Sequence, residues 1–253
     1  MLAAAATCPA TPLLVPDLAG GAVAELAGLR AAARAALAHL TGAEPDLLVL
    51  LGPAAVTGPV PAGTRGHLAP YGVDLETSTP PGPALVTPVG VVGSGPGVPV
   101  KGKPVLELSL ALTVGTWLLR DTGCPTPVLC YGVADGLAPP AAAGLGRELA
   151  GLAPRVAVLA MGEGSACRRE GGPGGWDERG EAFDIELARA LERADTGALA
   201  GLDPVLAERL MVTGRVPWQV LAGMVSPQAP LTGALTYAEA PYGVTYLVAR
   251  WTR

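Results

Sequence analysis

Residues 155–184, RVAVLAMGEGSACRREGGPGGWDERGEAFD, carry the strongest fold signal in the chain. Residues 155–161 form an apolar run without alternation, which is typical of a strand buried on both faces of a sheet. The run passes directly into a polar, glycine-rich loop, and a helical pattern begins at Phe183. Because open α/β sheets bind ligands at the carboxyl ends of their strands, we expect the chemistry of the protein in this loop. It carries Glu163, Ser165 and Arg168 but no histidine.

The composition indicates a globular protein with little affinity for polyanions. The 253 residues are 50% hydrophobic and carry a net charge of −5, which suits one substantial domain and disfavours nucleic acid or anionic membranes as partners. Apolar runs stay shorter than the roughly 20 residues that a membrane-spanning helix needs, and prolines near the N-terminus favour a first strand over a secretion signal. Four cysteines without a Cys-x-x-Cys pair indicate reduced thiols and hence a cytoplasmic protein.

Strand and helix patterns alternate along the chain. Buried strands are expected at 2–8, 46–51, 128–131 and 155–161, with a last pair, a hairpin or edge pair, at 231–238 and 244–251. Helices are expected at 20–40, 107–121, 140–152, 180–193, 203–211 and 216–224. Since a strand–helix–strand unit joins parallel strands, the order predicts a single α/β domain over residues 1–253. It should have a mostly parallel central sheet, helices on both faces and additional antiparallel strands.

Residues 52–104 differ from the rest of the chain. They are rich in proline and glycine and poor in helix formers, with a short strand expected at 73–77. A segment of this length without regular structure predicts a lid or an insertion.

The sequence offers few candidate ligands for a metal site. Non-haem iron and zinc sites use two or more histidines together with a carboxylate, and the chain has only His39 and His67. His39 falls in the last turn of the first expected helix, where a structural role is ordinary. His67 lies in the irregular segment and is the better functional candidate, although a loop histidine is more often a surface residue.

Nucleophilic catalysis is also weakly supported. Ser165 is one residue out of phase with the Gly-x-Ser-x-Gly elbow, and no histidine follows it in the chain. Cys167 precedes Arg168 and Arg169, which could lower its pKa and make the thiol reactive. An unreactive loop thiol is the simpler interpretation.

One short motif occurs twice. The sequence APYGV appears at 69–73 and again at 240–244, each time before an expected strand. Proline and glycine at these positions suit tight turns. The alternative is that Tyr71 and Tyr242 line one pocket.

Several stretches together resemble the class III extradiol ring-cleavage dioxygenase superfamily, which includes the protocatechuate 4,5-dioxygenase catalytic subunit and the Memo-like proteins. The stretches are CPATPLLVP at 8–16, LAPYGV at 68–73, residues 109–117, GEGS at 162–165 through DERGEAFD at 177–184, VPWQVLAG at 216–223 and PYGV at 241–244. The resemblance spans nearly the whole chain, is most specific over 155–225, and implies the same α/β fold.

The resemblance implies an Fe(II) ion held by two histidines and a carboxylate, with a further histidine as acid and base. This sequence departs from the pattern at each histidine position. The first ligand position is Ala10, the second falls in residues 52–55, GPAA, and the acid/base position is Ala166. Glu239 is the matching carboxylate, loosely placed. Alanine offers neither a lone pair nor a proton, so the site is expected to lack a resident cofactor.

Three functions remain open. The first is a metal-free pocket for an aromatic or acidic small molecule, lined by residues 8–17, 52–72, 162–177 and 237–243. The second is a ring-cleaving metalloenzyme with rebuilt ligands, drawing on His67, Glu163, Cys8 or Glu239, with Fe(II) as its cofactor. The third is a non-catalytic interaction scaffold, and the resemblance also suggests a homodimer.

The candidate residues follow from these functions. Catalysis, if present, would use Glu163, Ser165 or His67. The expected ligand-binding residues are Cys8, Ala10, Tyr71, Ser165, Arg168 and Tyr242. We expect Ala10, Ala54 and Ala166 to lie near one another.

Overall fold

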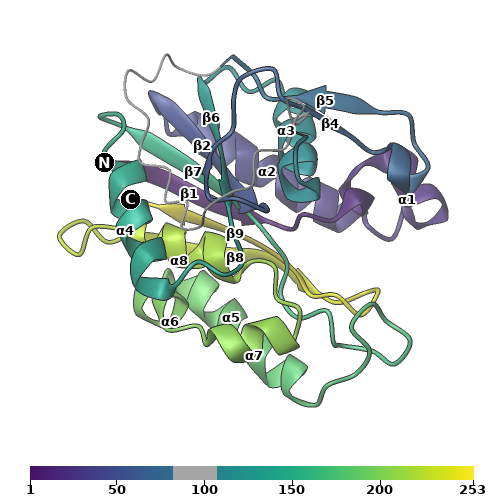
Figure 1. Cartoon of the computed structure of the whole chain (residues 1–253). Coiled ribbons are helices and arrows are strands. Elements are labelled where there is room, and N and C mark those ends of the chain that lie inside the picture. Colours follow the sequence, from purple (N-terminus) through teal and green to yellow (C-terminus); the bar gives the residue numbers. More distant parts are fainter. Residues whose placement is uncertain (82–106) are drawn as a thin grey trace, which may run out of the picture.

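A seven-stranded sheet forms the centre of the protein (Figure 1). We describe residues 1–81 and 107–253 of a computed structural model. The strand order is β3-β6-β2-β7-β1-β9-β8. The strands are β1 (Leu2–Cys8), β2 (Leu47–Pro53), β3 (Gly58–Pro59), β6 (Val128–Val133), β7 (Val156–Met161), β8 (Thr232–Glu239) and β9 (Tyr246–Thr252).

The inner strands of this sheet are parallel, as their continuous apolar sequences predict. β7 pairs in parallel with both β1 and β2, and β2 pairs in parallel with β6. Every residue of β1, β6 and β7 is buried, which is what a strand covered on both faces requires. β9 and β8 extend the sheet as the expected antiparallel hairpin, and β3 adds a short antiparallel strand at the other edge.

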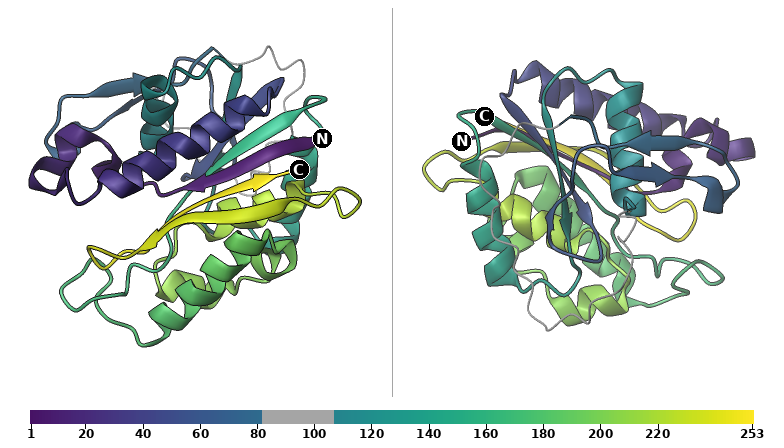
Figure 2. Two further views of the ribbon diagram at one scale, coloured as in Figure 1. Left: turned by 180° about the vertical axis from the view of Figure 1, so that it is seen from behind. Right: turned by 45° about the horizontal axis from the view of Figure 1, so that its top comes forward.

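Helices cover both faces of the sheet (Figure 2). One face packs against α2 (Ala27–Gly42) and α3 (Leu110–Asp121). The opposite face packs against a second group of helices. That group is α4 (Pro139–Ala150), α5 (Arg179–Arg193), α6 (Thr196–Ala200), α7 (Pro204–Arg209) and α8 (Arg215–Met224). The predicted fold class, an α/β domain with a mostly parallel central sheet and antiparallel additions, is therefore confirmed.

A buried tryptophan fixes α8 against the sheet. The Trp218 indole N–H donates to the Thr7 hydroxyl at 2.8 Å, and that hydroxyl donates to the Ala160 carbonyl at 3.0 Å. Both side chains are at most 1% exposed, so their polar atoms need these partners. The start of α8 is thereby held near the ends of β1 and β7.

Two helix predictions need correction. The first helix was expected at 20–40, but α2 begins at Ala27, after α1 (Pro16–Ala19) and a 3₁₀ turn at Gly20–Ala22. Gly20, with a positive φ of 49°, ends α1, and regular α-helical structure resumes only at Ala27. The sequence reading also missed α6, which begins at an Asp195 cap whose side chain accepts from the N–H of Ala198 at 2.9 Å.

The described part of the expected irregular segment has some regular structure. Besides β3 it contains β4 (Arg65–His67), a 3₁₀ turn at Ala69–Tyr71 and β5 (Glu76–Ser78). β4 and β5 pair antiparallel as a separate two-stranded sheet. The predicted strand at 73–77 is therefore displaced toward the C-terminus, and the rest of the predicted lid, from residue 82, lies outside the described residues. Within the described ranges, no helix is both long and apolar enough to cross a bilayer.

Candidate functional site

The loop after β7 is fixed by backbone contacts with the end of β1 and the start of α8. The Gly162 N–H donates to the Cys8 carbonyl at 3.0 Å, and the Gly214 N–H donates to the Glu163 carbonyl at 3.0 Å. A Cβ atom on Gly162 would lie 2.3 Å from the Gly214 Cα atom, closer than packing allows. The two glycines thus permit the loop to approach the start of α8, and this approach positions Glu163.

Glu163 and Thr213 form a reciprocal pair of hydrogen bonds. The Thr213 hydroxyl donates to Glu163 Oε2 at 2.6 Å and accepts the Glu163 N–H at 2.9 Å. Glu163 keeps partial solvent access, yet burial raises the pKa of its carboxyl group above the ordinary value. Hydrogen bonds from Thr213 and from the backbone of Ala10 act in the opposite direction. The backbone of Ala10, at the end of β1, therefore lies at the Glu163 carboxyl group.

Tyr246, at the start of β9, lies beside this carboxyl group and was not found from the sequence. Its side chain is 3% exposed, and its hydroxyl oxygen accepts a hydrogen bond from the Thr11 hydroxyl at 3.3 Å. Burial raises the Tyr246 pKa, Thr11 lowers it, and the nearby negative charge of Glu163 raises it further. The only sequence signal for this residue was its place next to the repeated APYGV motif.

Ser165 and Arg168 belong to a buried network around Asp184 rather than to an open pocket. Asp184, which is 3% exposed, accepts the Ser165 N–H at 2.8 Å, the Arg168 guanidinium at 3.0 Å and the Thr245 hydroxyl at 2.5 Å. The Ser165 hydroxyl accepts the Cys167 N–H at 3.0 Å and has no exposed surface. These contacts give both predicted site residues a structural role in shaping the loop.

The two cysteines singled out by sequence are buried thiols. Cys8 is fully buried on the α2–α3 face, and burial raises the pKa of its thiol to about 12. Burial, followed by the charge of Asp177, also raises the Cys167 pKa. This environment favours the protonated thiol, which agrees with the simpler interpretation of Cys167 as an unreactive loop thiol.

The two repeated tyrosines differ in environment. Tyr71 is 49% exposed in the 3₁₀ turn after β4. Tyr242 is partly buried, and its hydroxyl donates to Glu25 Oε2 at 2.8 Å. Glu239, the loosely placed carboxylate, accepts from the Tyr237 hydroxyl at 3.2 Å. Tyr242 lies close enough to Tyr246 for their charges to interact, which places it at the border of the Glu163 site.

The described side chains do not fit an iron site. His39 Nε2 lies 3.0 Å from the carbonyl of Trp251, which pairs with Ala5 in the middle of β1, and exposed His67 lies 3.7 Å from Glu107 Oε2. Among residues 1–81 and 107–253, no three His, Cys, Asp or Glu side chains are grouped so that they could hold a metal ion. The protonated thiol of Cys8 is not the ligand form of cysteine. A rebuilt site from Cys8, His67, Glu163 and Glu239 is thus not assembled.

The three alanines at the expected histidine positions follow neighbouring strands. Ala10 comes just after β1 and Ala54 just after β2, with β7 between the two strands. Ala166 lies in the loop after β7, where its N–H donates to the Leu210 carbonyl at 2.9 Å. All three are at the carboxyl ends of the parallel strands, where ligands bind in open α/β sheets.

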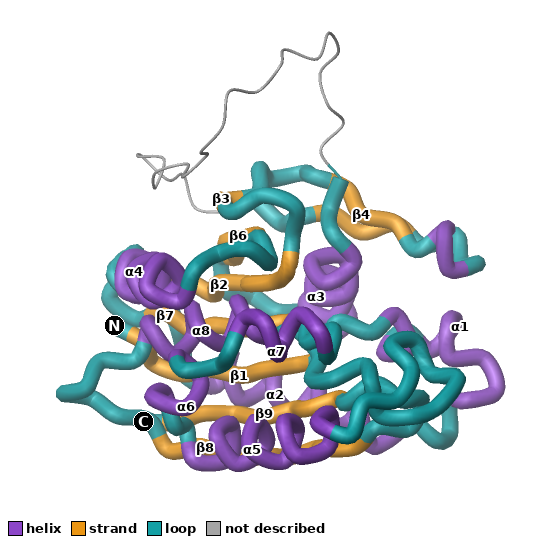
Figure 3. Tube along the Cα trace, turned by 60° about the horizontal axis from the view of Figure 1, so that its bottom comes forward, coloured by secondary structure: helices purple, strands orange, loops and turns teal. Residues whose placement is uncertain are grey.

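A cavity of about 620 Å³, here called the edge cavity, opens at the same end of the sheet between the starts of α4 and α8 and the helix α7. Figure 3 shows these three helices on one side of the sheet. Thr213 lines the cavity and also bonds to Glu163, so the cavity adjoins the raised-pKa carboxyl group. Its lining residues are Asp135, Gly136, Leu137, Ala138, Pro139, Pro204, Ala207, Glu208, Met211, Val212, Thr213, Arg215 and Val216.

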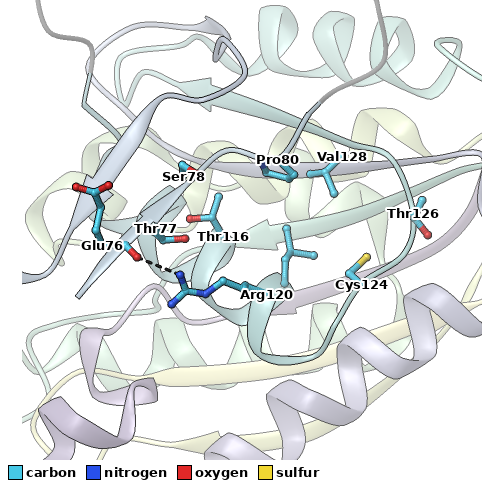
Figure 4. A pocket seen from close by; sticks show the side chains of 10 residues that line it. Glu76, Thr77, Ser78, Pro80, Thr116, Arg120, Cys124, Thr126 and Val128 are labelled. Atoms are coloured by element: carbon cyan, nitrogen blue, oxygen red, sulfur yellow. Dashed lines mark hydrogen bonds between the residues drawn. The ribbon is translucent and has the colours of Figure 1, made fainter.

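A smaller cavity of about 380 Å³ lies between β5 and α3 (Figure 4). Arg120 crosses it and donates to the Glu76 carbonyl at 3.2 Å. Val128, the first residue of β6, lines this cavity, so the cavity lies at the amino end of that strand. Pro80, close to the end of the first described range, also lines the cavity. The edge cavity is therefore the stronger candidate.

Comparisons with known proteins add support for the fold. No family model matches the sequence, and no curated protein matches it either. A crystal structure of an uncharacterized protein from Escherichia coli K12 superimposes with a TM-score of 0.57 at 14% identity, over 98% of this chain and 99% of that one. The chain therefore shares its overall α/β fold with that protein over nearly their full lengths.

Proposed function

We propose that the chain is a divergent class III extradiol dioxygenase-like protein that binds a small organic molecule in the edge cavity without iron. The observation that carries the proposal is the position of the edge cavity at the carboxyl ends of the parallel strands, where Thr213, a partner of Glu163, lines it. The cavity differs from the expected pocket, because no residue of 8–17, 52–72, 162–177 or 237–243 lines it. Its volume of about 620 Å³ lies within the usual range for small-molecule sites.

The lining has the composition of a ligand site. Its wall is mainly apolar, with a few polar groups at defined places. Met211 is 50% exposed at this wall and has a positive φ of 55°, an uncommon backbone conformation for a side chain of this kind. This conformation ends α7, where the Val212 N–H donates to the Ala207 carbonyl at 2.9 Å. The exposed apolar side chain of Met211 is what favours a binding site here.

The donor groups support binding rather than ring cleavage. Cleavage in the extradiol superfamily depends on imidazoles, and the matching positions here are Ala10, residues 52–55 and Ala166. The polar groups at this end of the sheet are instead the Glu163 carboxyl and the hydroxyls of Thr213 and Tyr246. Of these groups only Thr213 lines the edge cavity, where the other polar lining residues are Asp135, Glu208 and Arg215.

Methionine NMR tests the proposal directly, because Met211 lies on the cavity wall. The protein would be labelled with ¹³C at the methionine methyl groups, and the Met211 signal assigned with a Met211→Leu variant. Titration with a library of catechols, aromatic acids and aromatic amines should shift the Met211 signal while leaving the exposed Met1 signal unchanged.

A cavity-blocking variant and its control complete the test. Gly136 lines the cavity, and a Cβ atom there would have open space around it. Gly42, at the end of α2 and outside the cavity lining, has the same open space. Gly136→Trp should abolish the ligand-induced shifts, and Gly42→Trp should preserve them. If no compound shifts Met211, the pocket proposal fails and the scaffold alternative gains. Stoichiometric iron in protein purified anaerobically with iron would favour the metalloenzyme.

A further inference from the structure

The rim of the edge cavity carries two carboxylates without protein partners. Asp135 and Glu208 both line the cavity and are exposed at its mouth. Within the described ranges, neither carboxylate forms a salt bridge. A ligand entering the cavity therefore meets two exposed negative charges, opposed by the positive charge of the buried Arg215.

Arg215 lies near both carboxylates: burial lowers the pKa of its guanidinium, and the charges of Asp135 and Glu208 raise it by less. Its hydrogen bonds, however, go to other groups. The side chain is 7% exposed. Its Nη1 atom donates to the Leu137 carbonyl at 3.2 Å and to Gln219 Oε1 at 2.9 Å, and its Nη2 atom donates to the Asp135 carbonyl. These bonds hold the loop between β6 and α4 in place. The guanidinium is therefore engaged in shaping the cavity wall.

The two helix starts at the cavity are poor sites for an anion. Helix N-termini bind anions through their free N–H groups. Pro139 and Pro140 occupy the first two positions of α4, Pro217 occupies the third position of α8, and proline has no N–H. The Gly214 N–H at the cap of α8 already donates to Glu163. Few backbone donors remain for an acidic ligand.

We propose that the edge cavity selects an organic cation with an apolar body, such as an aromatic ring carrying a protonated amine. This inference rests on the proposed function and specifies its ligand. The apolar body packs against Leu137, Met211 and Val212, and the ammonium group faces Asp135 and Glu208. An acidic ligand of the same shape would meet the same carboxylates with like charge.

The size of the effect follows from the exposure of the two carboxylates. Solvent screens charges at a rim, so each of Asp135 and Glu208 should strengthen ammonium binding by only about threefold. Together they predict that an ammonium compound binds about tenfold more tightly than a neutral compound of the same shape. A carboxylate compound should bind more weakly than the neutral one.

Three matched compounds test this order. They are 3-phenylpropylamine, 3-phenylpropanol and 3-phenylpropanoate, which share a body and differ in charge. Their dissociation constants would be measured by titration of the Met211 methyl signal at low and high salt. Asp135→Asn and Glu208→Gln remove the rim charges with little change of shape, and Glu192→Gln, an exposed position of α5 outside the cavity lining, is the control.

The expected result is an amine preference that falls about threefold in each rim variant, falls at high salt, and is unchanged in Glu192→Gln. Equal binding of the three compounds, tightest binding of the propanoate, or an amine preference insensitive to Asp135→Asn and Glu208→Gln would overturn the cation inference while leaving the pocket standing. If no compound of this set or of the wider library shifts Met211, the proposed function itself fails.

Discussion

Replacing Thr213 with valine tests the hydrogen-bond pair that links the loop after β7 to the edge cavity. Valine has nearly the shape of threonine but lacks the hydroxyl, so the change removes one bond to the Glu163 carboxylate and one from the Glu163 N–H. Thr213→Ser retains the hydroxyl and is the matched control.

The structure fixes the sign and the approximate size of the effect. Burial raises the Glu163 pKa, so the protonated form fits the fold better and stability is lost as pH rises from the ordinary glutamic acid range through the folded pKa. The Thr213 hydroxyl opposes this loss by stabilising the ionised form. Without the hydroxyl, the pKa of Glu163 should rise further. Above that pKa, the free energy of unfolding should fall by about 1–2 kcal/mol, a typical value for a lost bond to a charged group with partial exposure.

Two measurements check this prediction. Urea unfolding of the wild type, Thr213→Val and Thr213→Ser between pH 4 and pH 8 gives the stability difference. Carboxyl ¹³C NMR gives the Glu163 pKa in each protein. A difference between wild type and Thr213→Val that stays constant over the pH range, or a lower Glu163 pKa in that variant, would refute the reasoning. Thr213→Ser should follow the wild type in both measurements.

Three further predictions follow from the same region. Glu163→Gln resembles the protonated acid, so its stability should fall less than that of the wild type as pH rises. Urea unfolding midpoints at pH 4 and pH 8 measure this fall in both proteins, and an equal fall would contradict the prediction. Asp184→Asn should lower the free energy of unfolding by about 2–4 kcal/mol, because it breaks the buried ion pair with Arg168. Glu181 pairs with the same arginine but is exposed, so the control Glu181→Gln should change this free energy by under about 0.5 kcal/mol. Gly162→Ala should lower stability by about 2 kcal/mol or more through its backbone clash, whereas Gly42→Ala, in open space, should have little effect in thermal unfolding.

The sheet could be predicted from sequence because its inner strands are encoded locally. A continuous apolar run such as residues 156–161 has one stable environment, a strand covered on both faces. The same logic located α3 and α8, whose apolar residues repeat at helical spacing. The starts of helices were harder to predict from the sequence. The helical spacing begins at Gly20, but Gly20 adopts a positive φ and α2 begins only at Ala27.

The candidate site was only partly predictable. The loop and Glu163 were found because they follow a recognisable strand. Thr213 and Tyr246 were missed because each lies far from that strand in the chain and reaches Glu163 only through the close approach of α8 and the pairing of β9. Ser165 and Arg168 looked like exposed loop residues, and it is the tertiary contact with Asp184 that buries them. Period and composition carry no information about such contacts.

The groups at the ends of β1 and β7 differ from the metal ligands that the resemblance implies. A carboxylate that coordinates a cation directs its lone pairs toward that cation. Here Glu163 directs them toward the Thr213 hydroxyl and the Ala10 backbone, and the position where the resemblance expects an imidazole contributes a main-chain donor instead. Every residue other than proline keeps this main-chain donor at position 10, so the hydrogen bond to Glu163 does not depend on the Ala10 side chain. Thr213, which exchanges hydrogen bonds with Glu163, also lines the edge cavity. Asp135 and Glu208 line the same cavity and carry exposed negative charges.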